Sequence, residues 1–357
     1  MRFSELEKVG YPILSVKPLV VNNCMVSVKG KFLVVSNEKF TIPIELRQFS
    51  DIWIMPNTYI SGGTLNILAK RGKAVIILGK AGVSSVLLPL ATRWFIRGDA
   101  AISQVKLFVS NRGLVAKKIV EGIIKNIRLL LDYLAGKRIL DRDSVNFAKK
   151  YVNRALERLN SASEINDIVS CEAEAWNFLY LALTEKFEFF TGRERRPPPD
   201  PLNALISYFN SILYGLFIRY VLKAGLEPTV SFIHSPYGYK RFALAFDLKD
   251  IFAPATSIRS AIVITNNLYK KGILGEAFEA TVKGCYLKEP YRSKIVKRFF
   301  NNLRRKIRGY SYFTWMYREC VKLREFVLGH TKSFEPWLWI TKPKRETISE
   351  VDFTAYR

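Results

Sequence analysis

The sequence predicts an α+β protein in which a small, mostly β N-terminal domain precedes a larger, all-helical C-terminal domain. Residues 1–95 contain short β-branched runs separated by Asn, Gly or Pro, a pattern typical of strands. From Ile102 onward, apolar residues recur at helical spacing. The 357 residues are enough for two domains, and 49% of them are apolar, which supplies a large core. We therefore expect a β domain over 1–95, a helical domain over 96–330 and a tail over 331–357.

Short segments define the β domain. The stretch "VKGKFLVVSNEKFTIPIEL" is typical of hairpins, with Lys-Gly and Ser-Asn at the turns. A short helix is expected at Ser61–Lys70, because Gly72 follows it and a buried-strand run begins at Ala74. The strands expected are Val16–Val21, Met25–Val28, Lys31–Ser36, Asp51–Met55 and Ala74–Gly79.

Helical periodicity dominates the rest of the chain. The first helix runs from Ile102 to Leu134, with Gly136 as its stop signal. "GRERRPPPDP" at Gly192–Pro201 cannot be helical and indicates a rigid loop that enters the next helix. Residues 331–357 have mixed charge and are expected to form a weakly packed tail. The other helices expected are Val145–Leu159, Ser163–Thr184, Leu202–Ala224, Pro254–Lys270, Tyr291–Arg308 and Thr314–Leu328.

Net charge narrows the class of function. The chain carries 56 Lys and Arg against 31 Asp and Glu, a formal charge of +25. A soluble protein this basic normally faces a polyanion, and most often that is nucleic acid. The longest apolar run, Ile212–Leu222, is interrupted by Arg219 and is shorter than the roughly 20 residues of a membrane span. The first residues lack the apolar core of a signal peptide. We expect a cytoplasmic nucleic-acid-binding protein without a membrane segment.

The four cysteines, Cys24, Cys171, Cys285 and Cys320, are far apart and form no C-x-x-C pair. This spacing excludes a zinc knuckle. Each is expected to be a small buried apolar residue and not half of a disulfide.

One histidine and a few acids could carry chemistry. His234 ends the apolar stretch "VSFI", and Asp247 and Asp250 follow, three residues apart, so they share a face if they lie on a helix. A strand hairpin or a strand-to-helix passage would bring His234 near Asp247. Glu172 lies one turn from Ala175 and Trp176 on an apolar stripe, where a carboxylate needs a counter-charge or a metal. One imidazole with two or three carboxylates suits Mn²⁺ or Mg²⁺, the metals of phosphoryl transfer.

Structural roles compete with this interpretation. His234 is equally consistent with a hydrogen-bonded core histidine, and Asp247 or Asp250 with a helix cap. Glu172 could pair with an arginine, and Glu174 competes with it as the functional acid.

The chain resembles the Cas1 family of CRISPR-associated integrases in four motifs that occur in order. They are "CEAEAW", "GRERRPPPDPLNALISYFNSILYG", "GLEPTVSFIHS" and "FALAFDLKDIFAP". The resemblance implies that Glu172, His234 and Asp250 bind the metal and that Asp247 also lines the site. Ala173, Trp176 and Ala253 depart from the usual glycine, alanine and arginine of these motifs.

The resemblance implies an enzyme of CRISPR spacer acquisition. Such proteins insert short foreign DNA fragments into the repeat array by attack of a DNA 3′-hydroxyl on a phosphodiester, and the same site can cut DNA as a metal-dependent endonuclease, a hydrolase. It also implies a homodimer, formed through the β domain, that a small partner protein, Cas2, bridges in pairs.

Clustered basic residues indicate where duplex or branched DNA would bind. Nine Lys or Arg and one acid, Glu289, lie between Lys288 and Arg308, interleaved with aromatic residues. A solvated helix face is the competing explanation. The residues predicted to contact DNA are Arg193, Arg195, Arg196, Lys240, Arg241, Lys294, Lys297, Arg298, Arg304 and Arg305.

Two other functions fit the same residues. A metal-dependent nuclease of repair would cut branched DNA without integrating it, and a non-enzymatic DNA-binding scaffold would use its carboxylates structurally. The product formed from branched DNA, or from a free 3′-hydroxyl fragment and a repeat-containing plasmid, separates the integrase from the nuclease. Metal-dependent joining or cleavage separates both from the scaffold.

Overall fold

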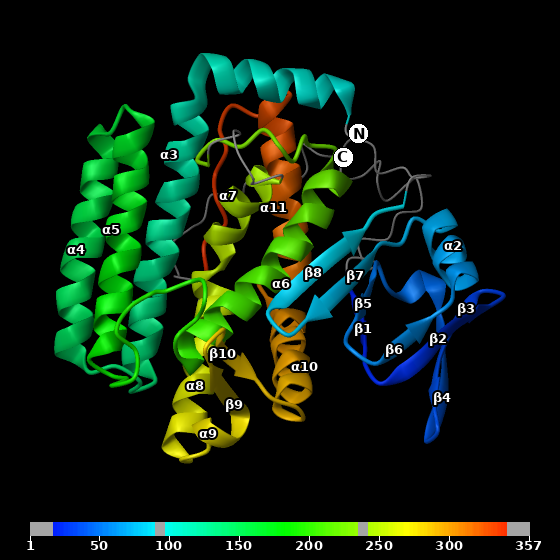
Figure 1. Cartoon of the computed structure of the whole chain (residues 1–357). Coiled ribbons are helices and arrows are strands. Elements are labelled where there is room, and N and C mark those ends of the chain that lie inside the picture. The colour runs from blue at the N-terminus through cyan, green and yellow to red at the C-terminus, as the bar shows by residue number, and fades with distance from the viewer. Residues whose placement is uncertain (1–16, 90–96, 235–241, 341–357) are drawn as a thin grey trace.

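The computed structural model describes residues 17–89, 97–234 and 242–340, and it confirms a strand-rich region followed by a helical one (Figure 1). A 3-10 turn lies at Leu46–Gln48, and helix α2 (Gly62–Lys70) interrupts the strands as predicted. The strands of this region are β1 (Leu19–Val21), β2 (Cys24–Lys29), β3 (Phe32–Asn37), β4 (Phe40–Glu45), β5 (Ile52–Ile54), β6 (Thr58–Ile60), β7 (Val75–Gly79) and β8 (Gly82–Leu87).

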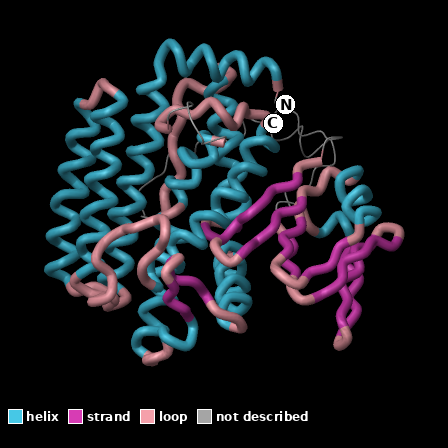
Figure 2. Tube along the Cα trace, in the orientation of Figure 1, coloured by secondary structure: helices cyan, strands magenta, loops and turns pink. Residues whose placement is uncertain are grey.

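These strands form two four-stranded sheets, in the orders β4-β3-β2-β6 and β1-β5-β7-β8. The predicted hairpins are present as the antiparallel pairs β2–β3 and β3–β4. We did not predict β6, a three-residue strand, or β8, which begins at Gly82 and pairs antiparallel with β7. Figure 2 shows most strands gathered on one side of the molecule and the helices on the other.

The strand-rich region has a small core of its own and also joins the main core. Val26, Leu33 and Ile52 belong to the small core that the two sheets and α2 enclose. Trp53 and Ile76, on the second sheet, belong to the main core with the helices. The boundary at residue 95 stays a prediction, because the buried side chains are continuous across it.

The helical region begins with α3 (Gly98–Gly136), whose backbone is non-helical at Asn111, where the helix kinks. The predicted helix around Pro254–Lys270 is a π-helical turn, Pro254–Ile258, continued by α8 (Arg259–Lys270). The other helices are α4 (Arg142–Ser161), α5 (Ile165–Thr184), α6 (Pro201–Ala224), α7 (Ala243–Phe252), α9 (Leu274–Ala277), α10 (Tyr291–Arg304) and α11 (Tyr312–Val327). Two short hairpins that we did not predict lie among them, β9 (Phe278–Thr281) with β10 (Gly284–Leu287) and β11 (Lys306–Ile307) with β12 (Tyr310–Ser311).

Helix α6 is the central helix of the fold, and its ends follow from its sequence. The Asp200 side chain caps it by accepting from Asn203 N at 2.9 Å, and Pro201 occupies the first turn. Gly225 ends it with φ +80°, a left-handed conformation that favours glycine. By length and composition α6 could cross a membrane, but 72% of its most apolar window is buried inside the structure, as in a core helix.

Several expectations are corrected here. Residues 331–340 are not weakly packed, since Phe334, Trp337 and Trp339 are all at most 4% exposed. The backbone of this segment is bonded to α3, because Asn126 Nδ2 donates to Trp337 O at 3.0 Å and Asn126 Oδ1 accepts from Trp339 N at 2.8 Å. The helix expected to reach Arg308 ends at Arg304, where the β11–β12 hairpin begins. All four cysteines are buried and free, as predicted.

Candidate functional site

The His234 backbone is held by one buried carboxylate. The segment before His234 is an irregular loop and not the expected strand, so its amides have no sheet partner. Asp247, which is 0% exposed, accepts from Phe232 N at 2.6 Å and Ile233 N at 3.0 Å with Oδ2. Its Oδ1 accepts from His234 N at 3.3 Å and contacts the ring Nδ1 at 2.7 Å. Because a carboxylate accepts, the proton lies on Nδ1 and Nε2 keeps its lone pair.

This arrangement separates the two aspartates of α7. The helix begins at Ala243, so both acids lie within it one turn apart. Asp247 uses both oxygens on the His234 loop. Asp250 is held by its neighbour, since Lys249 Nζ lies 2.5 Å from its Oδ1. Lys249 itself is only 7% exposed.

Glu172 of α5 completes a cluster of acids. Burial raises its pKa to about 7, and the negative charge of Asp250 adds to that rise, while a hydrogen bond from Trp176 and the charge of His234 oppose it. Trp176 Nε1 donates to Glu172 Oε1 at 3.1 Å. The tryptophan that departs from the motif therefore holds the acid. Glu172, His234, Asp247 and Asp250 thus influence one another electrostatically across α5, the loop and α7.

Glu174 of α5 points toward α4. Its carboxylate pairs with Arg158 of that helix. Of the two glutamates that the sequence left open, Glu172 is the one beside Asp250 and His234. The catalytic role of either residue stays a prediction.

The donor set fits a hard divalent cation in its chemistry. Two carboxylates and an imidazole nitrogen are ligands that Mn²⁺ and Mg²⁺ accept. A His whose other nitrogen bonds a carboxylate is the usual arrangement of a metal-binding histidine. Within the described residues, however, no three His, Cys, Asp or Glu side chains converge as a metal-binding group. Glu172 and Asp250 are instead drawn to Trp176 and Lys249.

The arginine-rich loop divides into fixed and free residues. Arg193 donates to Asn203 Oδ1 at 2.8 Å and to Ser207 Oγ at 2.9 Å, so α6 already uses its guanidinium. Arg195 and Arg196 are exposed and remain available for phosphate. Lys240 and Arg241 lie outside the described residues.

Helix α10 presents a basic surface. Its two phenylalanines, Phe299 and Phe300, are buried, and Phe299 stacks on Phe209 of α6 at 4.2 Å. The aromatic residues interleaved with the basic ones therefore anchor the helix. The predicted DNA contacts of this segment are all exposed: Lys294, Lys297, Arg298, Arg304 and Arg305.

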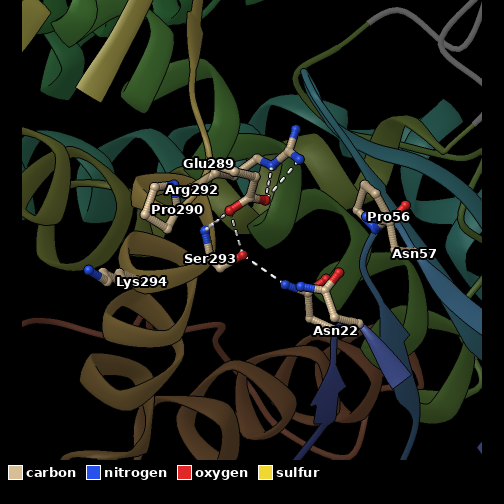
Figure 3. Close-up of a pocket in the computed structure, with 9 residues that line it drawn as sticks. Asn22, Pro56, Asn57, Glu289, Pro290, Arg292, Ser293 and Lys294 are labelled. Carbon is tan, nitrogen blue, oxygen red and sulfur yellow. Dashed lines mark hydrogen bonds and ion pairs between the residues drawn. The ribbon is translucent and has the colours of Figure 1, made fainter. Parts of the chain in front are cut away.

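A cleft of about 420 Å³ lies between the start of α10 and the strand-rich region (Figure 3). Asn22 Nδ2 donates across it to Ser293 Oγ at 2.7 Å, and Ser293 Oγ donates to Glu289 Oε2 at 2.7 Å. Glu289 also pairs with Arg292 at 2.8 Å. This network ties α10 to the strand-rich region and takes Arg292 out of the basic surface.

Lys249 and Trp176 are site residues that sequence reasoning did not assign. Both are adjacent in sequence to an acid or one turn from it, so helical spacing could have identified them.

Comparison with known proteins gives a consistent result. The family model described as "CRISPR associated protein Cas1" matches residues 19–301. A curated relative, "CRISPR-associated endonuclease Cas1 3" of Thermodesulfovibrio yellowstonii, is 30% identical over 329 residues, which span 87% of this chain and 95% of the relative.

Solved structures share the fold at lower identity. A Cas1 protein from Thermotoga maritima has a TM-score of 0.73 at 21% identity and covers 90% of this chain and 99% of its own. A structure titled "Casposase bound to integration product" has a TM-score of 0.71 at 19% identity, with 95% and 98% covered. One titled "Cas6-RT-Cas1--Cas2 complex" has a TM-score of 0.73 at 17% identity, with 91% and 36% covered.

Proposed function

The chain belongs to the Cas1 family of CRISPR-associated proteins, and we propose that it inserts short foreign DNA fragments into a CRISPR repeat array. The 3′-hydroxyl of a fragment would attack a phosphodiester at the repeat, forming one P–O bond while the bond to the displaced 3′-oxygen breaks. The number of phosphodiester bonds is unchanged, so the step needs no energy source.

One observation carries this proposal: Asp247 contacts His234 Nδ1 and lies one turn before Asp250 on α7, and the charges of Asp250 and His234 both act on the Glu172 carboxyl, in a chain of charge +25. These acids would repel DNA phosphate unless a cation binds between the carboxylates and the phosphate. Glu172, His234 and Asp250 would hold Mg²⁺ or Mn²⁺. When bound, the ion would lower the pKa of the attacking hydroxyl and offset charge on the phosphate.

The remaining residues have distinct tasks. Asp247 keeps the His234 proton on Nδ1, so that Nε2 can act as a ligand. Lys249 supplies the counter-charge at Asp250 until the cation arrives. The exposed arginines Arg195 and Arg196 and the α10 surface would bind the DNA backbone without reading its sequence.

We further propose that the chain works as a homodimer with a Cas2 partner in the cytoplasm. The outer face of the β4-β3-β2-β6 sheet exposes apolar residues, with Met25 at 63% and Tyr59 at 70%, and these two are cross-strand neighbours. Such a pair supports a contact with another chain. The fold shared with a chain of a Cas1–Cas2 complex supports the partner.

The test supplies the protein with a Cas2 protein, Mn²⁺ or Mg²⁺, a labelled DNA fragment and a plasmid that contains the repeat. A joined product that requires a free 3′-hydroxyl on the fragment is expected, and a 3′-dideoxy fragment should give none. Cutting of branched DNA without joining would identify a repair nuclease instead. Binding without either reaction would identify a scaffold.

A further inference from the structure

The loop that carries His234 is flanked along its length by the first part of α3. Arg97 N, at the helix cap, donates to Gly225 O at 3.2 Å. Seven residues later, Gln104 Nε2 donates to Glu227 O at 2.9 Å and to Val230 O at 2.5 Å. The same side chain accepts from Glu227 N at 3.0 Å with Oε1. We call residues 97–112 the arm.

The last contact of the arm is on the histidine itself. Arg112 Nε donates to Phe232 O at 2.6 Å, and Nη2 donates to Ile233 O at 2.7 Å and to His234 O at 3.3 Å. The guanidinium also lies 5.0 Å from the centre of the Phe108 ring, one turn earlier in the arm. Arg112 directly follows the kink at Asn111, which places it on the post-kink part of α3.

Arg112 and Asp247 bond the backbone of the same three residues. Asp247 accepts from the N–H groups of residues 232–234, and Arg112 donates to their carbonyls. In an irregular loop these groups have no regular partner, and leaving them unpaired when buried is costly. Two side chains of opposite charge therefore pair backbone groups that neighbouring strands would pair in a sheet. The loop has one conformation only when both side chains are ordered.

Gln104 is the second side chain of the arm that holds the loop in place. It is 0% exposed and uses both its amide oxygen and its amide nitrogen on the loop. A buried amide that is bonded this fully specifies one position for its partner. The arm thus bonds the loop at residues 225, 227, 230 and 232–234.

We propose that Arg112 and Gln104 are positioning residues for His234, and that the arm makes the position of the imidazole independent of bound DNA. This inference deepens the proposed function and rests on it for the role of His234. It assigns the arm no contact with the reacting atoms. Functional groups on loops need this kind of support to stay within a fraction of an ångström of the productive geometry.

The test compares Arg112→Ala, Arg112→Lys and Gln104→Ala with a matched control, Lys106→Ala, an exposed residue of the same arm. The first readout is hydrogen exchange of peptides that cover residues 227–234 in the protein without metal or DNA. We expect faster exchange for Arg112→Ala and Gln104→Ala, an intermediate rate for Arg112→Lys and no change for Lys106→Ala.

The second readout is the Mn²⁺ dependence of DNA joining or cutting. Loss of a residue that orients a metal ligand typically costs about 10–100-fold in affinity or activity. Arg112→Ala should fall in this range and recover in part at higher Mn²⁺, with Arg112→Lys closer to wild type.

Unchanged exchange and unchanged Mn²⁺ dependence in folded Arg112→Ala and Gln104→Ala would overturn the proposal. If Arg112→Ala does not fold, Gln104→Ala and Arg112→Lys decide it. Should His234→Ala keep full activity, the proposed function fails, yet the exchange readout still reports whether the arm fixes the loop.

Discussion

Asp51 and Glu172 have opposite electrostatic environments. Asp51, directly before β5, accepts two bonds from Arg219 of α6, at 2.8 and 2.5 Å, and one from Ala74 N at 3.0 Å. Burial acts to raise its pKa, but Arg219 and these bonds outweigh it, so the pKa lies below the ordinary value. Glu172 instead has its pKa raised to about 7, because burial and the charge of Asp250 act in the same direction.

The opposite pKa shifts of Asp51 and Glu172 distinguish a structural ion pair from a candidate cation site. The Asp51–Arg219 pair joins the strand-rich region to the central helix and needs nothing more. At Glu172 and Asp250, two acids influence each other, and among the described residues Lys249 pairs with Asp250 while Glu172 accepts from the neutral Trp176. A strongly perturbed acid beside a second acid is typical of places that bind a cation or do chemistry. We propose that the raised pKa of Glu172 reflects a role in binding a cation.

The largest effect is expected at Asp250. Asp250→Asn removes a proposed ligand and should abolish metal-dependent joining and cutting at every Mn²⁺ concentration. Asp247→Asn should reduce activity about 10–100-fold and recover in part with Mn²⁺, because this residue acts through His234. Titrating Mn²⁺ into both folded variants checks the order. Rescue of Asp250→Asn alone would reverse the two roles.

The free energy of unfolding should depend on the Asp51–Arg219 pair and not on Glu172. Arg219→Ala leaves Asp51 buried without its partner, and breaking a buried pair in this way costs about 3–5 kcal/mol of unfolding free energy. Glu172→Gln should not destabilise the metal-free protein, because it removes a charge that burial opposes. Denaturant unfolding of both variants measures the contrast. If Glu172→Gln costs as much as Arg219→Ala, the acid is structural.

The exposed cations of α10 differ from both acid sites, since Lys297 and Arg298 form no ion pair within the described chain. Replacing both by Ala should lower the slope of log affinity against log salt by up to about 1.8, at about 0.9 for each phosphate contact. Lys150→Ala with Arg154→Ala, exposed on α4, is the matched control. Anisotropy titrations with duplex DNA measure the slope. An unaltered slope in the α10 variant would mean that the path of DNA does not follow α10, and an equal change in the control would mean that the effect is not specific to this helix.

The smallest effect concerns Lys73, which donates to Phe49 O at 2.5 Å near the Asp51 pair. Burial lowers its pKa to about 8 from 10.5, although the charge of Asp51 opposes this. Between these values the unfolded chain holds a proton that the folded chain has lost, so stability should rise with pH in this window. Wild type should therefore gain stability relative to Lys73→Met from pH 8 to pH 10. Parallel curves for the two proteins over that range would contradict the lowered pKa.

The sequence was informative wherever the signal is local. Helical periodicity predicted α3 to α6, and the order of the motifs brought Glu172, His234 and Asp250 into consideration. Arg112 could not be found in this way, because it bonds to backbone carbonyls more than a hundred residues later, and a carbonyl is present in every residue type. Residues 331–340 were misjudged for a similar reason: the mixed charge of the segment indicated exposure, whereas Trp337 and Trp339 pack into the core. The rest of the predicted tail, 341–357, lies outside the described residues.

The central claim is that Glu172, and not its neighbour Glu174, belongs to a cation site. Binding of Mn²⁺ to the protein without DNA, measured by calorimetry or electron paramagnetic resonance, tests it most directly. Wild type and Glu174→Gln should bind Mn²⁺ alike, because Glu174 pairs with Arg158. Glu172→Gln should lose the bound ion while keeping its fold. Binding by Glu172→Gln as tight as wild type, or its loss in Glu174→Gln alone, would contradict the account.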